Sequence, residues 1–190
     1  MFDLSLVDTL RLGFGQVVHH HKAHAHAASS FARWSRFFRV SETLLMMSVV
    51  LTALSAAFGK GHAYAIAAAV CASVALLAFL IHVTFDFEAA ARAHHISSTK
   101  LWHIREQYRA LLSDVTDGAV EPEFARARRN LLMEQLTVIY ETAPPLTRRV
   151  FKASQPSKDT AEEVALEDRE IDRFLPKSLH APKKKETTAA

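Results

Sequence analysis

The chain has 190 residues, 49% of them hydrophobic and 23% charged, and its formal net charge is +3. So mild a basic balance argues against direct nucleic-acid binding. Five glycines leave little material for a phosphate-binding loop, and a single cysteine, Cys71, excludes a disulfide framework or a cysteine-based zinc site within one chain.

Residues 1–40 are predicted to form a helical juxtamembrane segment, with one or two helices between residues 4 and 38. Histidines crowd residues 19–26, and those at 20 and 24 fall on neighbouring helix turns, so metal binding or pH-tuned membrane binding is conceivable. No carboxylate or cysteine lies near them, and we therefore expect a solvated or lipid-facing helix surface. Trp34, Phe37 and Phe38 occupy the place of an interfacial aromatic anchor.

Two apolar stretches follow within residues 41–85, and they predict transmembrane helices at about 41–58 and 63–85. A membrane span needs roughly 20 apolar residues, and no charge lies at the centre of either stretch. The alternative is a buried hairpin in a soluble helical protein, for which two adjacent runs of this length are unusual. A signal peptide does not fit, because the first run begins late and a second follows at once.

The positive charges around the hairpin predict its orientation. The connecting turn carries only Lys60, whereas both outer flanks are rich in arginine and lysine. The flanking cations are Arg33, Arg36, Arg39, Arg92, Lys100, Arg105 and Arg109. The positive-inside rule then places both termini in the cytoplasm.

Each predicted span carries a stripe of small residues. Hydroxyl side chains line one face of the first span, and alanines line one face of the second, which continues to His82. The residues are Ser41, Ser48, Thr52 and Ser55 in the first, and Ala65, Ala68, Ala72 and Ala75 in the second. Such stripes let helices pack closely. Alternatively, Ser48, Thr52, Ser55 and His82 line a pore, which requires several subunits because two spans enclose no pathway. Glu42 and His82 would then lie near its cytoplasmic mouth.

Residues 86–153 are predicted to form a cytoplasmic antiparallel helical hairpin, whose first helix continues from the second span. Apolar residues in that helix recur in alternating steps of three and four, which indicates a heptad seam. The seam comprises Phe87, Ala90, His94, Ser97, Leu101, Ile104, Tyr108, Leu111 and Val115. It must be buried against the same chain or a neighbouring subunit, and Leu101, Ile104, Tyr108 and Leu111 are the candidate assembly residues.

The second helix of this hairpin has clear local signals at both ends. Gly118 predicts the end of the preceding helix and Pro122 the start of the next. Its predicted apolar face consists of Phe124, Leu131, Leu132, Gln135, Leu136 and Ile139. Pro144 and Pro145 end it, and a short helical piece is expected at residues 146–153.

Residues 154–190 are predicted to contain a short acidic helix and a basic tail. A capping box at Thr160 and Glu163 starts the helix, which runs to about Phe174 with Val164, Ile171 and Leu175 on one side. From residue 177 onward, including the lysines at 183–185, we expect disorder.

No enzyme is predicted. The chain lacks a glycine-rich phosphate loop, a Gly-x-Ser-x-Gly motif and a His-Glu-x-x-His motif. His94, His95 and His103 have no evident nucleophile or carboxylate partner. We therefore expect no catalytic residue, no cofactor and no metal. The fold class expected is an all-α membrane protein.

The order of elements resembles the SLATT family, the SMODS and SLOG-associating two-transmembrane effector domain of bacteria. A basic, histidine-bearing helix leads through Arg33-Trp34-Ser35-Arg36 to a tight two-span hairpin. Residues 101–114 (LWHIREQYRALLSD), 128–136 (RRNLLMEQL) and 140–144 (YETAP) follow. The resemblance covers residues 17–154, and its motifs are helical patterns, not catalytic signatures.

The resemblance implies an effector of a bacterial conflict system. Such proteins are proposed to assemble in the inner membrane and to form pores that depolarise or kill the infected cell, when a separate nucleotide-second-messenger sensor or synthase reports infection. We accordingly expect a multi-pass inner-membrane protein that forms homo-oligomers in the lipid bilayer. Two alternatives stay open: a non-conducting structural or adaptor protein whose cytoplasmic helices dock a partner, and a histidine-dependent metal transporter.

Overall fold

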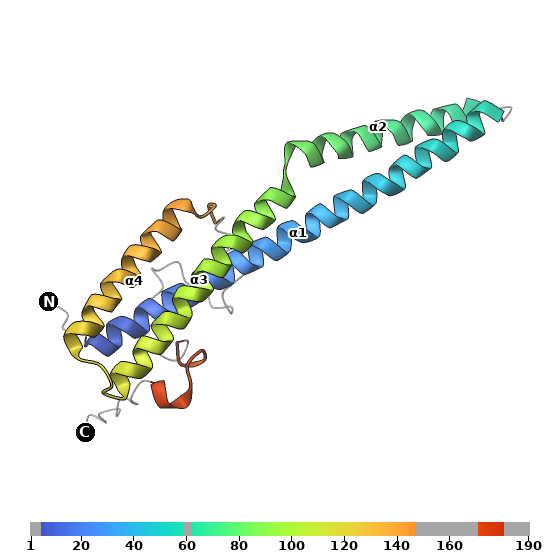
Figure 1. Ribbon diagram of the computed structural model, residues 1–190. Helices are drawn as coiled ribbons and strands as arrows, with labels where there is room; N and C mark the ends of the chain where they lie inside the picture. The colour runs from blue at the N-terminus through green and yellow to red at the C-terminus, as the bar shows by residue number, and fades with distance from the viewer. Residues whose placement is uncertain (1–4, 59–61, 147–170, 181–190) are drawn as a thin grey trace, which may run out of the picture. The chain divides into compact units, whose positions relative to one another are not determined.

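The computed structural model describes residues 5–58, 62–146 and 171–180, and all regular structure in these ranges is helical. Figure 1 shows the helices α1 (Leu6–Phe58), α2 (His62–Thr84), α3 (Phe87–Thr116) and α4 (Pro122–Thr142), and a short 3₁₀ helix, η1, covers Lys177–Leu179. The all-α prediction is confirmed for the described residues. The helical pieces predicted at 146–153 and in residues 160–170 lie outside them, apart from residue 146. The chain divides into two compact units. One is His26–His95, and the other is formed by Met1–Ala25 together with Ile96–Ala190.

The first unit, His26–His95, contains two adjacent apolar helices. α1 ends at Phe58 and α2 begins at His62, close to the predicted span limits. Both helices are long and apolar enough to cross a membrane, and within their most apolar stretches 0% and 6% of the residues are buried. A core helix of a soluble protein would be mostly buried, so this exposure favours a membrane hairpin. The predicted juxtamembrane helix and first span form one unbroken helix, α1.

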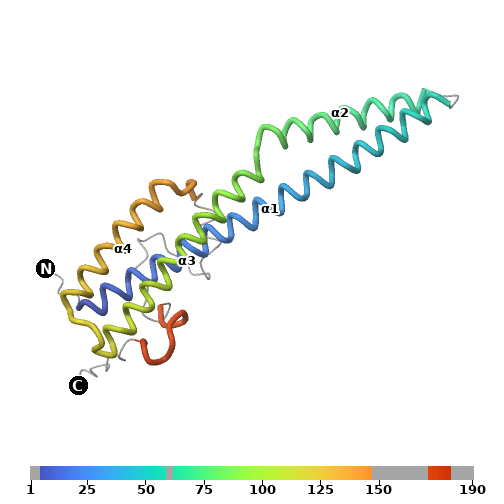
Figure 2. Tube along the Cα trace, viewed as in Figure 1, coloured from blue at the N-terminus to red at the C-terminus, as the bar shows by residue number. Residues whose placement is uncertain are grey.

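The prediction that the second span continues directly into the next helix is wrong. α2 ends at Thr84 and α3 begins at Phe87, and Figure 2 shows the interruption in the backbone trace. The side chain of Asp86 accepts a hydrogen bond of 2.8 Å from the backbone N–H of Ala89. Asp86 therefore caps the start of α3, where it satisfies one of the donors that a helix start leaves open.

The second unit, Met1–Ala25 with Ile96–Ala190, has a continuous apolar core. The start of α1, most of α3 and all of α4 contribute side chains to this core. Its largest fully buried members are Tyr108, Phe14, Leu10, Leu101, Leu112, Leu132, Ile171, Val17 and Val18. The predicted seam of α3 faces this core, and Leu101, Ile104, Tyr108 and Leu111 are between 0% and 4% exposed. The chain thus buries these four residues itself.

The turn between α3 and α4 follows its sequence signals. Gly118 has a φ of +66°, a left-handed conformation that glycine adopts at little cost. The N–H of Gly118 donates to the carbonyl of Val115, and that of Ala119 to Asp114, which are the two bonds of a Schellman motif. Pro122 then occupies the first turn of α4, where no N–H is needed.

The predicted apolar face of α4 is only partly correct. Leu132, Leu136 and Ile139 are buried, as predicted, together with Ala125. Phe124 and Leu131, by contrast, are 60% and 41% exposed. These two residues point away from the core because α4 carries apolar residues on more than one face.

The prediction of disorder from residue 177 onward is wrong for its first part. Leu179 is 7% exposed and belongs to the core, together with Ile171 and Leu175. The buried guanidinium of Arg11 donates to Asp172 Oδ1 at 2.6 Å and also to the backbone carbonyl of Leu179. Residues 171–180 are therefore held on the core by a polar anchor as well as by apolar contacts. Residues 181–190 lie outside the described ranges.

Candidate functional site

Small and medium-sized residues together make up the face along which α1 and α2 pack within the hairpin unit. Ala75, on α2, is 2% exposed and lies at the centre of this face. The half-buried residues of α1 on this side are Ser41, Leu45, Ser48, Val49, Thr52 and Ala56. Those of α2 are Ala68, Cys71, Ala78, Ile81 and His82. The predicted alanine stripe needs one correction: Ala65 and Ala72 are exposed, and Cys71 and Ala78 take their places.

The hydroxyl stripe of α1 lies along one edge of this packing face. Ser48 and Thr52 are half-buried, whereas Ser55 falls just outside the face and is exposed. Their hydroxyls donate to backbone carbonyls one turn earlier in α1, at 3.0 Å for Ser48, 2.7 Å for Thr52 and 2.9 Å for Ser55. Bonds of this kind satisfy the hydroxyl donors inside an apolar helix. The stripe therefore serves close packing while one of its members faces outward.

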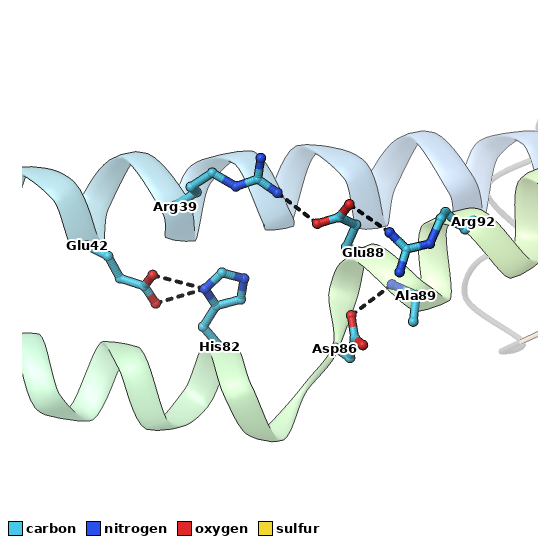
Figure 3. A network of polar contacts seen from close by, with 7 residues as sticks. All are labelled: Arg39, Glu42, His82, Asp86, Glu88, Ala89 and Arg92. Atoms are coloured by element: carbon cyan, nitrogen blue, oxygen red, sulfur yellow. Dashed lines mark hydrogen bonds and ion pairs between the residues drawn. The ribbon is translucent and has the colours of Figure 1, made fainter.

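An acid–histidine pair joins the two helices near one end of the hairpin (Figure 3). Nδ1 of His82 lies 2.9 Å from Oε1 and 3.0 Å from Oε2 of Glu42. The side chains are 24% and 18% exposed, respectively. A carboxylate beside an apolar span is costly unless it is paired, and His82 supplies that partner. The sequence placed both residues near the same end of the spans, and the structure brings them into contact.

A second charged group lies close to this pair (Figure 3). Glu88 accepts hydrogen bonds from Arg39 at 2.8 Å and from Arg92 at 2.7 Å. All three side chains are more than half exposed, so each bond contributes about 1 kcal/mol or less. The two arginines and Asp86 mark the end of the hairpin at which charged side chains replace apolar ones.

Aromatic rings surround the same end of the hairpin. Phe38 stacks on Phe87, with ring centroids 5.3 Å apart, and lies 6.2 Å from the ring of His82. Trp34 and Phe37, which were predicted as an anchor together with Phe38, are 52% and 58% exposed. Two of the three predicted anchor residues thus face outward, and Phe38 packs inside the unit.

The histidine-rich stretch is not the solvated or lipid-facing surface that we expected. His19 and His24 are 8% and 2% exposed. His21 donates from Nδ1 to the backbone carbonyl of Ser98 at 2.9 Å, and the ring of His20 lies 4.9 Å from that of Tyr140. The stretch faces inward because these histidines share a helix face with the core residues of α1. Tertiary packing of this kind has no signature in the local sequence.

Burial also changes the protonation of two histidines. The pKa of His20 is lowered by burial and, to a smaller extent, by the charge of His19. Burial likewise lowers the pKa of His94, whose ring stacks on Phe31 at a centroid distance of 5.5 Å. Both rings therefore favour the neutral form. Within the described residues, no group of three or more His, Cys, Asp or Glu side chains is placed to hold a metal ion.

Two adjacent helices that are long and apolar enough to span a membrane, with large apolar residues exposed on their outside, fit the class of a two-pass membrane protein. The SMODS and SLOG-associating 2TM effector domain family 4 matches residues 6–170. The chain belongs to this family, and the predicted resemblance is confirmed. The family is described as an effector domain associated with SMODS and SLOG, and not as a catalytic one. No curated protein and no solved structure matches the chain.

Proposed function

We propose that the chain is the membrane effector of a bacterial conflict system, and that it assembles as a homo-oligomeric pore in the inner membrane. The observation that carries this proposal is the hairpin formed by α1 and α2 in a chain of the 2TM effector family. Depolarisation of the infected cell is the proposed outcome. A separate nucleotide-second-messenger sensor or synthase is the proposed source of activation.

The exposed surface of the hairpin supports residence in a bilayer. Large apolar side chains cover the outside of both helices at exposures between 48% and 88%, among them Leu51, Phe58, Ile66, Leu77 and Val83. In water such a surface would drive aggregation, whereas lipid chains or neighbouring subunits solvate it. The arginine-rich flanks favour a topology with both termini and residues 86–190 in the cytoplasm.

The hydroxyl stripe of α1 is the proposed pore lining. One hairpin encloses no pathway, so several copies must surround it. Ser55 is exposed, and Ser48 and Thr52 lie beside it at the edge of the packing face. Copies arranged with this edge inward would present hydroxyl oxygens to the axis and leave the large apolar residues to lipid. The Glu42–His82 pair would then stand near the cytoplasmic mouth.

Membrane potential in bacteria that express the chain tests the proposal. We expect depolarisation, reported by a potential-sensitive dye, and we expect Ser55→Leu to reduce it because the leucine side chain would narrow and dehydrate the pore. Ser73→Leu is the matched control, since Ser73 is also an exposed span hydroxyl that bonds within its own helix, to Ala69 at 2.9 Å. Ser48 and Thr52 are less suitable sites, because leucine there would also disturb hairpin packing.

The depolarisation results distinguish a pore from a non-conducting adaptor. Depolarisation that persists unchanged in the Ser55→Leu protein would contradict the pore lining proposed here. A chain that inserts in the membrane but never depolarises it, with or without a co-expressed messenger synthase, would favour the adaptor function instead.

One observation gives the adaptor alternative specific support. Outside the candidate spans, α4 exposes Phe124, Met133 and Val138 at 60%, 54% and 59%. Phe124 and Val138 fall on the same side of α4 at the period of the helix, and Met133 falls on another side. A non-conducting adaptor would dock its partner on the side that carries Phe124 and Val138. Replacement of Phe124 and Val138 by serine would then abolish its function without changing membrane insertion.

A further inference from the structure

A cavity of about 340 Å³ opens on the surface of the unit formed by Met1–Ala25 and Ile96–Ala190. Its walls come from the first turns of α1, from α3 and from α4. Ligand pockets in proteins usually measure about 300–1,000 Å³, so the volume suits a small molecule. None of the described residues that line it is acidic.

Tyr108 forms one wall of the cavity. The residue is 2% exposed, and its ring presses against the backbone of α1 at Gly13, where a Cβ atom would lie 3.0 Å from Cε1 and 3.3 Å from the hydroxyl oxygen. A larger residue at position 13 would require the ring to shift by a few tenths of an ångström. Among the described residues, no hydrogen-bond partner is found for the Tyr108 hydroxyl, which can therefore donate to a ligand in the cavity that Tyr108 lines.

Tyr140 and Arg129 of α4 add two further donors. Arg129 is half-buried and donates to Asn130 Oδ1 at 2.9 and 3.2 Å. No carboxylate within the described part of the chain lies at ion-pair distance from it. The cavity therefore carries a positive charge that its own walls do not neutralise.

The two phenols remain hydrogen-bond donors near neutral pH. Burial and, to a smaller extent, the neighbouring Tyr108 together raise the pKa of Tyr140 to about 12. Burial also raises the pKa of Tyr108, although the charge of Arg129 opposes this change. Neither phenol is thus converted to an anion that would neutralise Arg129.

We propose that this cavity binds a small organic anion. The oxyanion head of the ligand accepts hydrogen bonds from Arg129, Tyr108 and Tyr140. Its flat apolar body lies against Met133 and Leu136, which also line the cavity. An accidental packing defect would be lined by apolar groups and stay dry, whereas this cavity is lined by the guanidinium of Arg129 and two phenols and by no carboxylate. The inference holds whether or not the spans conduct.

Calorimetric titration of the full chain in neutral detergent tests the site. The probes are phenyl phosphate and benzoate, which differ in the oxyanion, together with inorganic phosphate and benzyl alcohol, which each lack one half of the proposed ligand. We expect one phenyl phosphate or benzoate to bind per chain. Benzyl alcohol should bind at least tenfold more weakly, since hydrogen bonds to a charged group contribute about 1.5–3 kcal/mol.

Variants identify the site. Arg129→Gln should weaken binding about 10- to 100-fold for whichever of phenyl phosphate and benzoate binds more tightly. Arg126→Gln is the matched control, because Arg126 is an exposed arginine of the same helix that does not line the cavity. Tyr140→Phe keeps the ring and its packing and should weaken binding about threefold to tenfold. This second variant tests the site even if Arg129→Gln disturbs folding.

Three results would overturn the proposal. The first is the absence of saturable binding for both phenyl phosphate and benzoate. The second is an equal loss of binding affinity in the Arg126→Gln and Arg129→Gln proteins. The third is binding of inorganic phosphate as tight as that of phenyl phosphate, which would remove the role assigned to the apolar wall.

Discussion

The anchor between Arg11 and Asp172 gives the sharpest test of the packing described for residues 171–180. The two residues are 161 positions apart, and their side chains meet at 2.6 Å. The side chain of Arg11 is 3% exposed and that of Asp172 is 21% exposed. Asp172→Asn would keep the shape of the acid but remove the negative charge that lies 2.6 Å from the buried guanidinium.

The expected cost follows from this burial. Loss of one partner of a buried ion pair costs about 3–5 kcal/mol, and the partial exposure of Asp172 lowers the figure to about 2–3 kcal/mol. Because tenfold in an equilibrium corresponds to about 1.4 kcal/mol, local opening of residues 171–180 should become about 30- to 150-fold more frequent.

Limited trypsin digestion measures this opening. Arg173 and Lys177 lie within the segment, and cleavage after them requires the backbone to leave its packed conformation. Mass spectrometry of the fragments should show faster cleavage at these two sites and an unchanged rate after Arg126 of α4. Asp114→Asn, at an exposed acid of α3, is the control variant.

A double-mutant cycle completes the test. Asp172→Asn combined with Arg11→Met should reduce the stability of the segment by clearly less than the sum of the two single changes, because the two side chains contact each other directly. Cleavage in the Asp172→Asn protein within twofold of the parent rate would refute the anchor.

The remaining predictions concern the cap, the core and the histidines. Asp86→Ala should reduce stability by about 1 kcal/mol through loss of the cap of α3, and an unchanged thermal midpoint would contradict the capping role. Leu132→Ala, at a side chain 0% exposed, should cost about 2–5 kcal/mol in chemical denaturation, whereas Val138→Ala, at an exposed position, should change stability by about 0.5 kcal/mol or less. An equal loss of stability in these two variants would contradict the assignment of Leu132 to the core. The pKa values of His20 and His94 are lowered in the folded chain, so the unfolded chain binds more protons once the pH falls below about 6.5. Thermal stability should therefore decline from pH 7 to pH 5, with a flatter profile in His20→Gln, and a gain of stability on acidification would contradict the assignment.

Local signals in the sequence predicted much of this fold. Gly118 and Pro122 mark the turn between α3 and α4, and Pro144 follows the end of α4, because glycine and proline restrict the backbone directly. The seam of α3 was predicted from its periodicity, since one helix face must be buried. The limits of the two apolar helices follow from length and composition alone.

Features that depend on distant residues were missed. The histidines of α1 resemble a polar surface in the sequence, and only the packing of the core shows His19 and His24 to be buried. The contact of Arg11 with Asp172 joins the two ends of the chain, and no local pattern indicates it. By contrast, the interruption before α3 did have a signal, because Asp86 followed by an acid two residues later is typical of a helix start.

The candidate site could be predicted only in part. The sequence placed Glu42 and His82 near the same end of the spans, but the pairing of their side chains required the structure. The sequence placed the hydroxyl stripe on one side of α1, but only the structure shows that Ser48 and Thr52 are half-buried and that Ser55 is exposed. The cavity beside Tyr108 joins three helices and has no counterpart in any linear motif.

The central claim is that several copies of the hairpin form a conducting pathway, and the dependence of ion efflux on protein density tests it most directly. Purified chain is reconstituted into vesicles of bacterial polar lipids over a range of protein-to-lipid ratios, and efflux of a trapped potassium load is followed. Because one hairpin encloses no pathway, efflux should rise more steeply than the first power of protein density, and Ser55→Leu should reduce it while Ser73→Leu does not. Efflux that stays at the level of empty vesicles at every density, with and without added cyclic nucleotides and despite confirmed insertion, would contradict the account.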